Sequence, residues 1–344
     1  MKKTSLNDIA QQLGVSKTLV SLVLNGKARE HRISAEVCKR VEKLAKELNY
    51  KPNQIAKGLR TGQTNTIGLM IADIANPFFG KLGREIEKEA ASHGYRVIFC
   101  SSDENAENSR EQIELLQQGQ VDGFIIAPPA GSENQILSLK KNRTPFVLID
   151  RHFPDIETNY IVVDNVQASY EAVTHLINKG YRKIACVTLN VHLNNMNQRV
   201  LGYKQALIDN NIPVDEELIK MMPFSHEKND VVFAVKQLFE ENNRKANAVF
   251  FATSKLGIMG IETIHSLGLT IPDDVAVVSF DDPDAYKISQ PPISAIAQPL
   301  QEIGRESIKV LLALMNNNKA NTEVQKIVLK SKFIPRKSSD SLFL

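Results

Sequence analysis

The chain has 344 residues, which exceeds one typical hydrophobic core and predicts two or three domains. Its ordinary globular composition, with 42% hydrophobic and 24% charged residues, excludes a disordered or fibrous protein. The sequence has no apolar run of about 18 residues and no signal-peptide-like start, so we expect a cytoplasmic protein without membrane spans. Three widely separated cysteines agree with a reducing compartment and predict no disulfide framework.

Charge is distributed unevenly along the chain. Residues 1–62 contain 13 Lys and Arg against 5 Asp and Glu, hence a net charge of +8. Residues 63–344 contain 29 against 34, hence a net charge of −5. A basic module followed by a slightly acidic body is typical of a protein that binds a polyanion, and a solvated basic surface is the alternative.

Two short helices joined by a glycine-containing turn are predicted at the N-terminus. Apolar residues recur at helical spacing over 6–13, with Ser5 placed as the N-cap and Gly14 as the left-handed residue at the end. Ser16 is placed to cap a second helix over residues 17–25. This arrangement predicts a helix-turn-helix, whose second helix meets base edges with its N-terminal end. The outward residues at that end are Lys17, Thr18, Ser21 and Leu22.

A third helix is predicted over about 35–48, with Ser34 as its N-cap. Three helices this short are not stable singly, so we expect them to share one small core. Cys38 lies on the inner or flanking face of this helix, where packing is favoured over nucleophilic chemistry.

A short hinge segment follows over residues 50–62. Pro52 can begin a helix there and Gly62 can end it, but so short a helix needs a partner helix or DNA to remain folded. Leu59 is an exposed apolar residue between basic neighbours. We interpret Leu59 as a wedge that enters between base steps in the minor groove.

These N-terminal residues resemble the lactose/galactose-repressor (LacI/GalR) family. The resemblance is carried by Asp8-Ile9-Ala10, Gly14-Val15-Ser16, Val23-Leu24-Asn25-Gly26, Tyr50-Lys51-Pro52-Asn53 and Leu59-Arg60-Thr61-Gly62. It implies that double-stranded operator DNA is a partner, that Lys17 and Thr18 read bases, and that Ala56 packs one turn before the inserted Leu59. The candidate DNA-binding residues are Ser16, Lys17, Thr18, Ser21, Leu22, Asn25, Asn53, Ala56 and Leu59.

The N-terminal region departs from the family pattern at two places. Leu22 stands where members usually have an arginine, so a polar interaction with a base is missing. The loop over residues 27–32 is longer than usual by about three residues. Its basic side chains either contact phosphates or form a solvated loop, and the sequence leaves both alternatives open.

The remainder of the chain alternates apolar runs with amphipathic helices. This rhythm predicts an α/β body with doubly wound parallel sheets, and the number of strands predicts two lobes. Strands are predicted at 66–72, 96–101, 123–127, 146–150, 160–163, 183–189, 248–252, 275–280 and 293–298. Helices are predicted at 79–93, 107–119, 166–179, 198–210, 228–242, 256–267 and 300–316.

Polar and aromatic residues recur where these strands end. Ligands of such sheets bind outside the carboxyl ends of the strands, and hydroxyl-rich ligands need aromatic faces together with paired hydrogen-bonding groups. The candidate ligand-binding residues are Asn76, Phe78, Phe79, Asp150, Arg151, Arg199, Phe224, Thr253, Asp281 and Gln298.

Each candidate has a structural alternative. Phe78 and Phe79 are compatible with core packing, and the adjacent Asp150 and Arg151 with a surface ion pair. Arg199, predicted to open a helix, is compatible with clamping the backbone there. Asp281 is compatible with capping a turn or helix.

The body is similar to the periplasmic-sugar-binding-protein fold that the repressor family shares, and the resemblance implies the same ligand-contacting set. Thr253 departs from the pattern, because the family usually has Asn-Asp at 253 and 254. We therefore predict a helix-turn-helix domain over 1–50, a hinge over 51–63, a body over 64–336 and a tail over 337–344. Lobe 1 is predicted over 64–163 and 294–322, and lobe 2 over 164–293 and 323–336.

The sequence lacks a dinucleotide fingerprint, a P-loop, a nucleophile elbow and metal-ligand spacing, so no cofactor, metal or catalytic site is expected. The predicted function is a homodimeric repressor that binds operator DNA and responds to a small molecule, with a sugar or sugar derivative as the expected effector. A solute-binding protein for transport and a cytoplasmic sugar enzyme are the alternatives. No membrane partner is expected.

Overall fold

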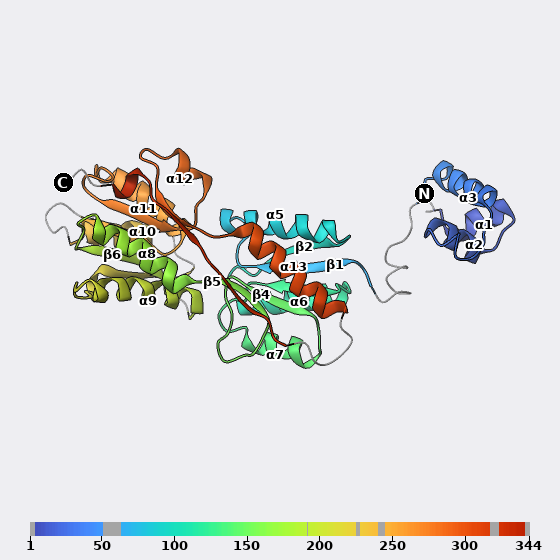
Figure 1. The fold of residues 1–344 in the computed structure, drawn as a ribbon, viewed down its shortest axis with the longest axis horizontal. Helices are drawn as coiled ribbons and strands as arrows, with labels where there is room; N and C mark the ends of the chain where they lie inside the picture. The colour runs from blue at the N-terminus through green and yellow to red at the C-terminus, as the bar shows by residue number, and fades with distance from the viewer. Residues whose placement is uncertain are drawn as a thin grey trace. The chain divides into compact units, whose positions relative to one another are not determined.

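The computed structural model describes residues 4–50, 63–190, 192–224, 228–239, 245–316 and 323–340. Contacts divide the chain into two units, Met1–Thr64 and Asn65–Leu344, hereafter the headpiece and the body (Figure 1). Within the described residues, no helix combines the length and apolar character needed to cross a membrane.

The headpiece contains the three predicted helices, α1 (Leu6–Leu13), α2 (Lys17–Leu24) and α3 (Ala35–Glu47). Ser5 and Asp8 form a reciprocal capping box at the start of α1, and Gly14 ends this helix with φ of 65°. Ser16 and Ser34 accept backbone hydrogen bonds at the starts of α2 and α3. Ile9, Val20 and Val41 are fully buried in the shared core, which confirms the predicted three-helix arrangement.

The described residues of the body form two six-stranded sheets. The first has the order β11-β5-β4-β3-β1-β2 and the second β12-β10-β9-β8-β6-β7. All of the strand pairs are parallel except β10 with β12. Central strands such as β3 and β9 are buried along their whole length, as expected of parallel sheets covered on both faces.

The two lobes are each built from both halves of the body sequence. Lobe 1 contains β1 (Thr66–Ile71), α5 (Pro77–Ser92), β2 (Arg96–Ser101), α6 (Ala106–Gln118), β3 (Gly123–Ile126), α7 (Glu133–Lys141), β4 (Phe146–Ile149), β5 (Tyr160–Val163), α13 (Leu300–Asn316) and β11 (Lys326–Leu329). Lobe 2 contains α8 (Asn165–Asn178), β6 (Ile184–Leu189), α9 (Asn194–Asp209), η1 (Glu216–Leu218), β7 (Ile219–Met222), α10 (Lys228–Phe239), β8 (Ala248–Phe251), α11 (Ser254–Ser266), β9 (Ala276–Phe280), α12 (Asp284–Ile288), β10 (Ser294–Ala297), β12 (Lys332–Ile334) and η3 (Lys337–Ser339).

The predicted lobe boundaries are wrong for two strands. β10 lies in the predicted lobe 1 range of 294–322 but pairs with β9 of lobe 2. β11 lies in the predicted lobe 2 range of 323–336 but pairs with β5 of lobe 1. The chain therefore crosses between lobes after β5, after β10 and again between β11 and β12 (Figure 1). The assignment of β10 and β11 to their lobes follows from strand pairing across long sequence separations, which no local pattern encodes.

Residues 337–340, which the sequence assigns to a polar tail, are packed into lobe 2. Ser338 and Ser339 are fully buried. Ser338 Oγ donates to the carbonyl of Val277 at 2.7 Å, and Ser339 Oγ lies 2.6 Å from Ser294 Oγ and 2.8 Å from His175 Nε2. These contacts attach the end of the described chain to α8, β9 and the start of β10.

This attachment is expected to weaken in acid. Burial, followed by the charge of Lys179, lowers the pKa of His175, with Asp340 opposing the shift. Because the folded-state pKa lies below the unfolded value of about 6.5, this stabilisation is complete above that pH and is lost as pH falls through the folded pKa. We therefore expect His175→Gln to flatten the fall in unfolding free energy measured between about pH 7.5 and 5. The half-exposed His93→Gln is the control, and parallel wild-type and His175→Gln curves would contradict the expectation.

Candidate functional site

The second helix of the helix-turn-helix presents an exposed N-terminal end. Ser16, Lys17, Thr18 and Asn25 are exposed, whereas Ser21 and Leu22 are half-buried. Ser16 Oγ accepts from the Leu19 amide at 3.2 Å, and Asn25 Nδ2 donates to the Ser21 carbonyl at 2.7 Å. Lys17 and Thr18 therefore remain available for contacts outside the headpiece, while Ser16 and Asn25 also fix the two ends of α2. The predicted DNA-binding residues Asn53, Ala56 and Leu59 lie outside the described residues.

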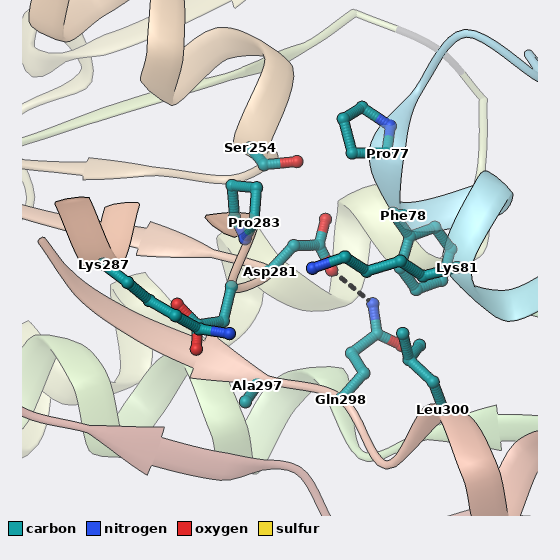
Figure 2. Close-up of a pocket in the computed structure, with 11 residues that line it drawn as sticks. Pro77, Phe78, Lys81, Ser254, Asp281, Pro283, Lys287, Ala297, Gln298 and Leu300 are labelled. Atoms are coloured by element: carbon teal, nitrogen blue, oxygen red, sulfur yellow. Dashed lines mark hydrogen bonds between the residues drawn. The ribbon is translucent and has the colours of Figure 1, made fainter. Parts of the chain in front are cut away.

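The body has a cavity of about 280 Å³ between its lobes (Figure 2). Figure 2 shows Phe78 and Lys81 approaching from α5 of lobe 1, opposite Pro283 and Lys287 of lobe 2. The lining residues are Pro77, Phe78, Lys81, Ser254, Asp281, Asp282, Pro283, Lys287, Ala297, Gln298 and Leu300. Three predicted ligand-binding residues, Phe78, Asp281 and Gln298, are thus brought together in one cavity.

Asp281 and Gln298 form the polar side of this cavity. Gln298 Nε2 donates to Asp281 Oδ1 at 2.6 Å, and the buried Gln298 Oε1 has no partner among the described residues. Burial raises the pKa of Asp281, with Arg199 and Gln298 opposing the rise. Asp281 is the N-cap of neither adjacent helix, because Thr253 caps α11 and α12 begins after Pro283 without a side-chain cap. An acceptor without a partner beside a carboxylate suits hydroxyl donors of a ligand.

Arg199 does not line this cavity and is 2% exposed. Its Nε donates to Asn165 Oδ1 at 2.9 Å and its Nη1 to the Ala252 carbonyl at 2.7 Å. The guanidinium carbon lies 3.5 Å from the centroid of the Phe280 ring. Desolvation lowers the pKa of Arg199, and the charges of Asp281 and Asp150 oppose this shift. The guanidinium, which remains protonated in proteins, therefore faces two carboxylates. The prediction that Arg199 opens its helix is wrong, because α9 begins five residues earlier at Asn194.

Asp150 and Asp281 occupy matching places in the two lobes, each directly after a strand. Both have left-handed backbones, with φ of 65° and 66°. This conformation is uncommon for residues other than glycine and is typical of functional or tightly constrained positions. Asp150 accepts from Asn195 Nδ2 at 3.1 Å, a hydrogen bond between the lobes that no local sequence pattern predicts.

Arg151 lines a second, smaller cavity of about 150 Å³ rather than the first. The guanidinium forms a bidentate pair with Glu104, at 2.8 Å to Oε1 and 2.7 Å to Oε2. The alternative of a surface ion pair between Asp150 and Arg151 is wrong, since both side chains are buried and Arg151 pairs primarily with Glu104. Sequence reasoning missed Glu104, which lies in a loop after β2 with no apolar periodicity around it.

The other four predicted ligand-binding residues line neither cavity. Asn76 caps α5 by accepting from the Phe78 amide at 3.0 Å, and Thr253 caps α11 by accepting from the Leu256 amide at 3.3 Å. Phe79 packs edge-on against Phe78 in the core, which agrees with the predicted core alternative. The half-buried Phe224 has Lys255 Nζ at 5.9 Å from its ring centroid.

An exposed ion pair bridges the mouth of the first cavity. Lys81 Nζ of lobe 1 and Lys287 Nζ of lobe 2 each lie 2.9 Å from a carboxylate oxygen of Asp284. Their hydrogen bonds lower the pKa of Asp284 to about 2. One carboxylate therefore pairs with both lysines of the cavity, and the three side chains together keep a formal charge of +1. Among the described residues, no group of three or more His, Cys, Asp or Glu is arranged to hold a metal ion.

Comparison with known proteins identifies the class to which this protein belongs. Residues 5–53 match the model of bacterial regulatory proteins of the lacI family, and residues 64–337 match that of periplasmic binding proteins and the sugar-binding domain of the LacI family. A helix-turn-helix joined to such a body defines a transcription regulator and not an enzyme. The chain belongs to the LacI family.

Similar proteins share this organisation over nearly their whole length. The transcriptional regulator DegA of Bacillus subtilis is 31% identical over 99% of both chains. Catabolite control protein A of Priestia megaterium is 29% identical over 96% of this chain and 98% of its own. The structure of a CelR–cellobiose complex has a TM-score of 0.71 at 25% identity, covering 98% of this chain and all of that chain. The lac repressor dimer bound to operator and an anti-inducer has a TM-score of 0.85 at 23% identity over 99% and 100%, which shows a shared fold.

Proposed function

We propose that this regulator acts in the cytoplasm as a homodimeric repressor, binding operator DNA through its headpiece and an uncharged, hydroxyl-rich carbohydrate between its lobes. The observation that carries the effector assignment is the pair of Asp281 and Gln298 that lines the interlobe cavity, with the charge of Arg199 acting on Asp281. The similar CelR was solved with cellobiose, and a similar Enterococcus faecium regulator, 29% identical, with ribose. Both support a carbohydrate effector for this chain.

The charges around the cavity favour a neutral ligand. Lys81 and Lys287 both pair with Asp284. The neighbouring Arg336 forms a bidentate pair with Asp282, at 2.7 and 2.8 Å. An anionic effector would compete with Asp284 and Asp282 for these cations, whereas a polyol needs only the hydrogen-bonding groups that remain. Phe78 adds an apolar surface suited to the C–H face of a sugar ring.

Closure of the two lobes around a ligand provides a mechanism for changing the affinity for DNA. The lobes are joined by the crossings after β5, after β10 and between β11 and β12. A ligand held by both lobes favours one relative orientation of them, and a dimer would transmit that change to paired DNA-binding segments. The coupling is reciprocal, because a sugar that changes DNA affinity must have its own affinity changed equally by DNA.

The test begins with a duplex selected from random DNA by the full-length protein. A panel of neutral mono- and disaccharides is then screened for sugars that raise the melting temperature. We expect a stabilising sugar to change affinity for the selected duplex. Asp281→Asn should weaken sugar binding at least about tenfold, since a hydrogen bond to a charged group contributes about 1.5–3 kcal/mol. Gln298→Ala should weaken it about two- to tenfold, since a neutral hydrogen bond contributes about 0.5–1.5 kcal/mol.

The control is Asp273→Asn, which removes an exposed carboxylate of the same lobe. It should leave sugar affinity unchanged. Stabilisation only by sugar phosphates, or equal sugar affinity in the wild type and both cavity variants, would show that the proposed effector class or site is wrong.

A further inference from the structure

The segment between α2 and α3 is a compact turn. The Lys27 amide donates to the Leu22 carbonyl at 2.9 Å, and the Ile33 amide donates to the Ala28 carbonyl at 2.9 Å. Ala28 and Ile33 are half-buried and pack against the headpiece core. Both ends of the segment are therefore anchored to the core, and the backbone between them is fixed. We refer to residues 27–32 as the basic turn.

The basic turn carries a cluster of positively charged side chains that are exposed to solvent. Lys27, Arg29 and Arg32 are exposed, and none forms an ion pair with another described residue. Glu30 is the single acidic residue within the turn, so its formal charge is +2 with His31 neutral. By contrast, exposed arginines of the body such as Arg110 and Arg305 each pair with two glutamates. Unpaired cations held on a fixed backbone form a ready surface for a polyanion.

Arg32 has an unusual backbone conformation. Its φ is 52°, in the left-handed region that costs energy for a side chain other than glycine, asparagine or aspartate. An arginine there places a third cation on the turn at a conformational cost. Such outliers persist where the surrounding structure over-determines them, and they are concentrated at functional positions.

The length of α2 indicates which surface this turn would meet. α2 has eight residues and is therefore about 12 Å long. The major groove of B-DNA is also about 12 Å wide. When the N-terminal end of α2 lies over base edges, its C-terminal end reaches the edge of the groove, where the sugar-phosphate backbone runs. The basic turn begins at Lys27, three residues after the last residue of the helix.

We propose that the basic turn binds the phosphate backbone flanking the bases read by α2, through Lys27, Arg29 and Arg32. This inference rests on the proposed DNA binding and deepens it. The turn adds affinity and positions the headpiece but carries no base preference, because phosphates are the same at every sequence. It also contributes charge-dependent binding in a headpiece whose Leu22 offers only apolar contacts.

The experiment measures how the affinity of the full-length protein for its selected duplex depends on salt. We expect the variant Lys27→Gln/Arg29→Gln/Arg32→Gln to bind more weakly at low salt. The slope of log K against log salt should become less negative by about 0.9 for each phosphate that the turn no longer neutralises, up to about 2.7 for three phosphates. Ethylation of specific phosphates should block binding of the wild type and no longer affect this variant. Arg29→Lys/Arg32→Lys, which keeps the charge, should retain most of the slope.

The matched control is Lys39→Gln/Arg40→Gln/Lys43→Gln, which removes three exposed charges from α3 of the same headpiece. An equal change of slope in this control would mean that overall charge and not the turn is responsible, and would overturn the inference. A loop variant with the wild-type slope and ethylation pattern would also overturn it, while leaving DNA binding itself established. Failure of the wild type to select any duplex would instead refute the proposed DNA binding, and this inference with it.

Discussion

Replacing Glu104 with alanine is expected to destabilise the body by about 3 kcal/mol or more, because it leaves Arg151 as an incompletely compensated buried charge. The side chains of Glu104 and Arg151 are only 3% and 5% exposed. Glu104 Oε1 also accepts from the Ala130 amide at 3.3 Å, so this carboxylate connects the loops after β2 and β3 with the end of β4. Asp150, 3.6 Å from Arg151 Nε, provides only partial compensation.

The measurement is the free energy of unfolding of the full-length protein in denaturant. Glu114→Ala is the matched control, because Glu114 pairs with Arg110 at 2.6 Å but both side chains are about half exposed. We expect the control to cost no more than about 1 kcal/mol, since surface pairs contribute little. Glu104→Ala/Arg151→Met should recover part of the stability by removing the isolated charge. A Glu104→Ala protein as stable as the control would contradict the expected cost of isolating Arg151.

Replacing Arg199 with methionine is expected both to destabilise the body by about 3–5 kcal/mol and to abolish sugar binding. The substitution removes the hydrogen bonds to Asn165 and to the Ala252 carbonyl. It also leaves Asp281 and Asp150 without the buried positive charge that faces both. Removing one partner of a buried charged set is more costly than removing the whole set. Arg199→Met/Asp281→Asn should therefore be more stable than Arg199→Met.

The stability of Arg199→Met is expected to change with pH in a defined direction. Burial raises the pKa of Asp281, and Arg199 opposes the rise. Without Arg199 that pKa rises further above the unfolded value of about 3.9, so the folded state binds a proton at higher pH than the unfolded state does. The stability of Arg199→Met should then increase on acidification from about pH 7.5 to 5, relative to the wild type.

Melting at several pH values checks this expectation. Arg305→Met, which removes an exposed arginine paired with Glu302 and Glu306, is the control and should follow the wild-type pH profile. A parallel pH profile for Arg199→Met, or undiminished sugar binding, would contradict the role assigned to Arg199.

The sequence predicts some of the residues that line the cavity. Phe78, Asp281 and Gln298 were all predicted at the carboxyl ends of strands, and they line one cavity. The rule works within each lobe, because parallel strands of one sheet end at the same edge, and the cavity lies where residues of both lobes meet. It cannot separate residues that enter the cavity from those that cap the next helix, as Asn76 and Thr253 do, because both roles use the same residue types at the same place.

Sequence alone determined the local structure of this protein and its class. The helices of the headpiece, their serine caps and Gly14, and the alternation of buried strands with helices follow from hydrophobic periodicity and capping chemistry, which act over a few residues. The basic headpiece and its motifs also indicated the LacI family, which the comparisons establish for the whole chain. These features need no knowledge of which distant segments meet.

The tertiary structure decided which segments and charges meet across long separations. It assigned β10 and β11 to lobes opposite to those expected, attached Ser338 and Ser339 to lobe 2, and paired Glu104 with Arg151. Edge strands such as β11 are short and partly exposed, so their local pattern is weak. Two buried charges form a stable pair when their mutual attraction offsets the desolvation of both groups. Which two groups become buried together depends on packing that only the folded chain creates.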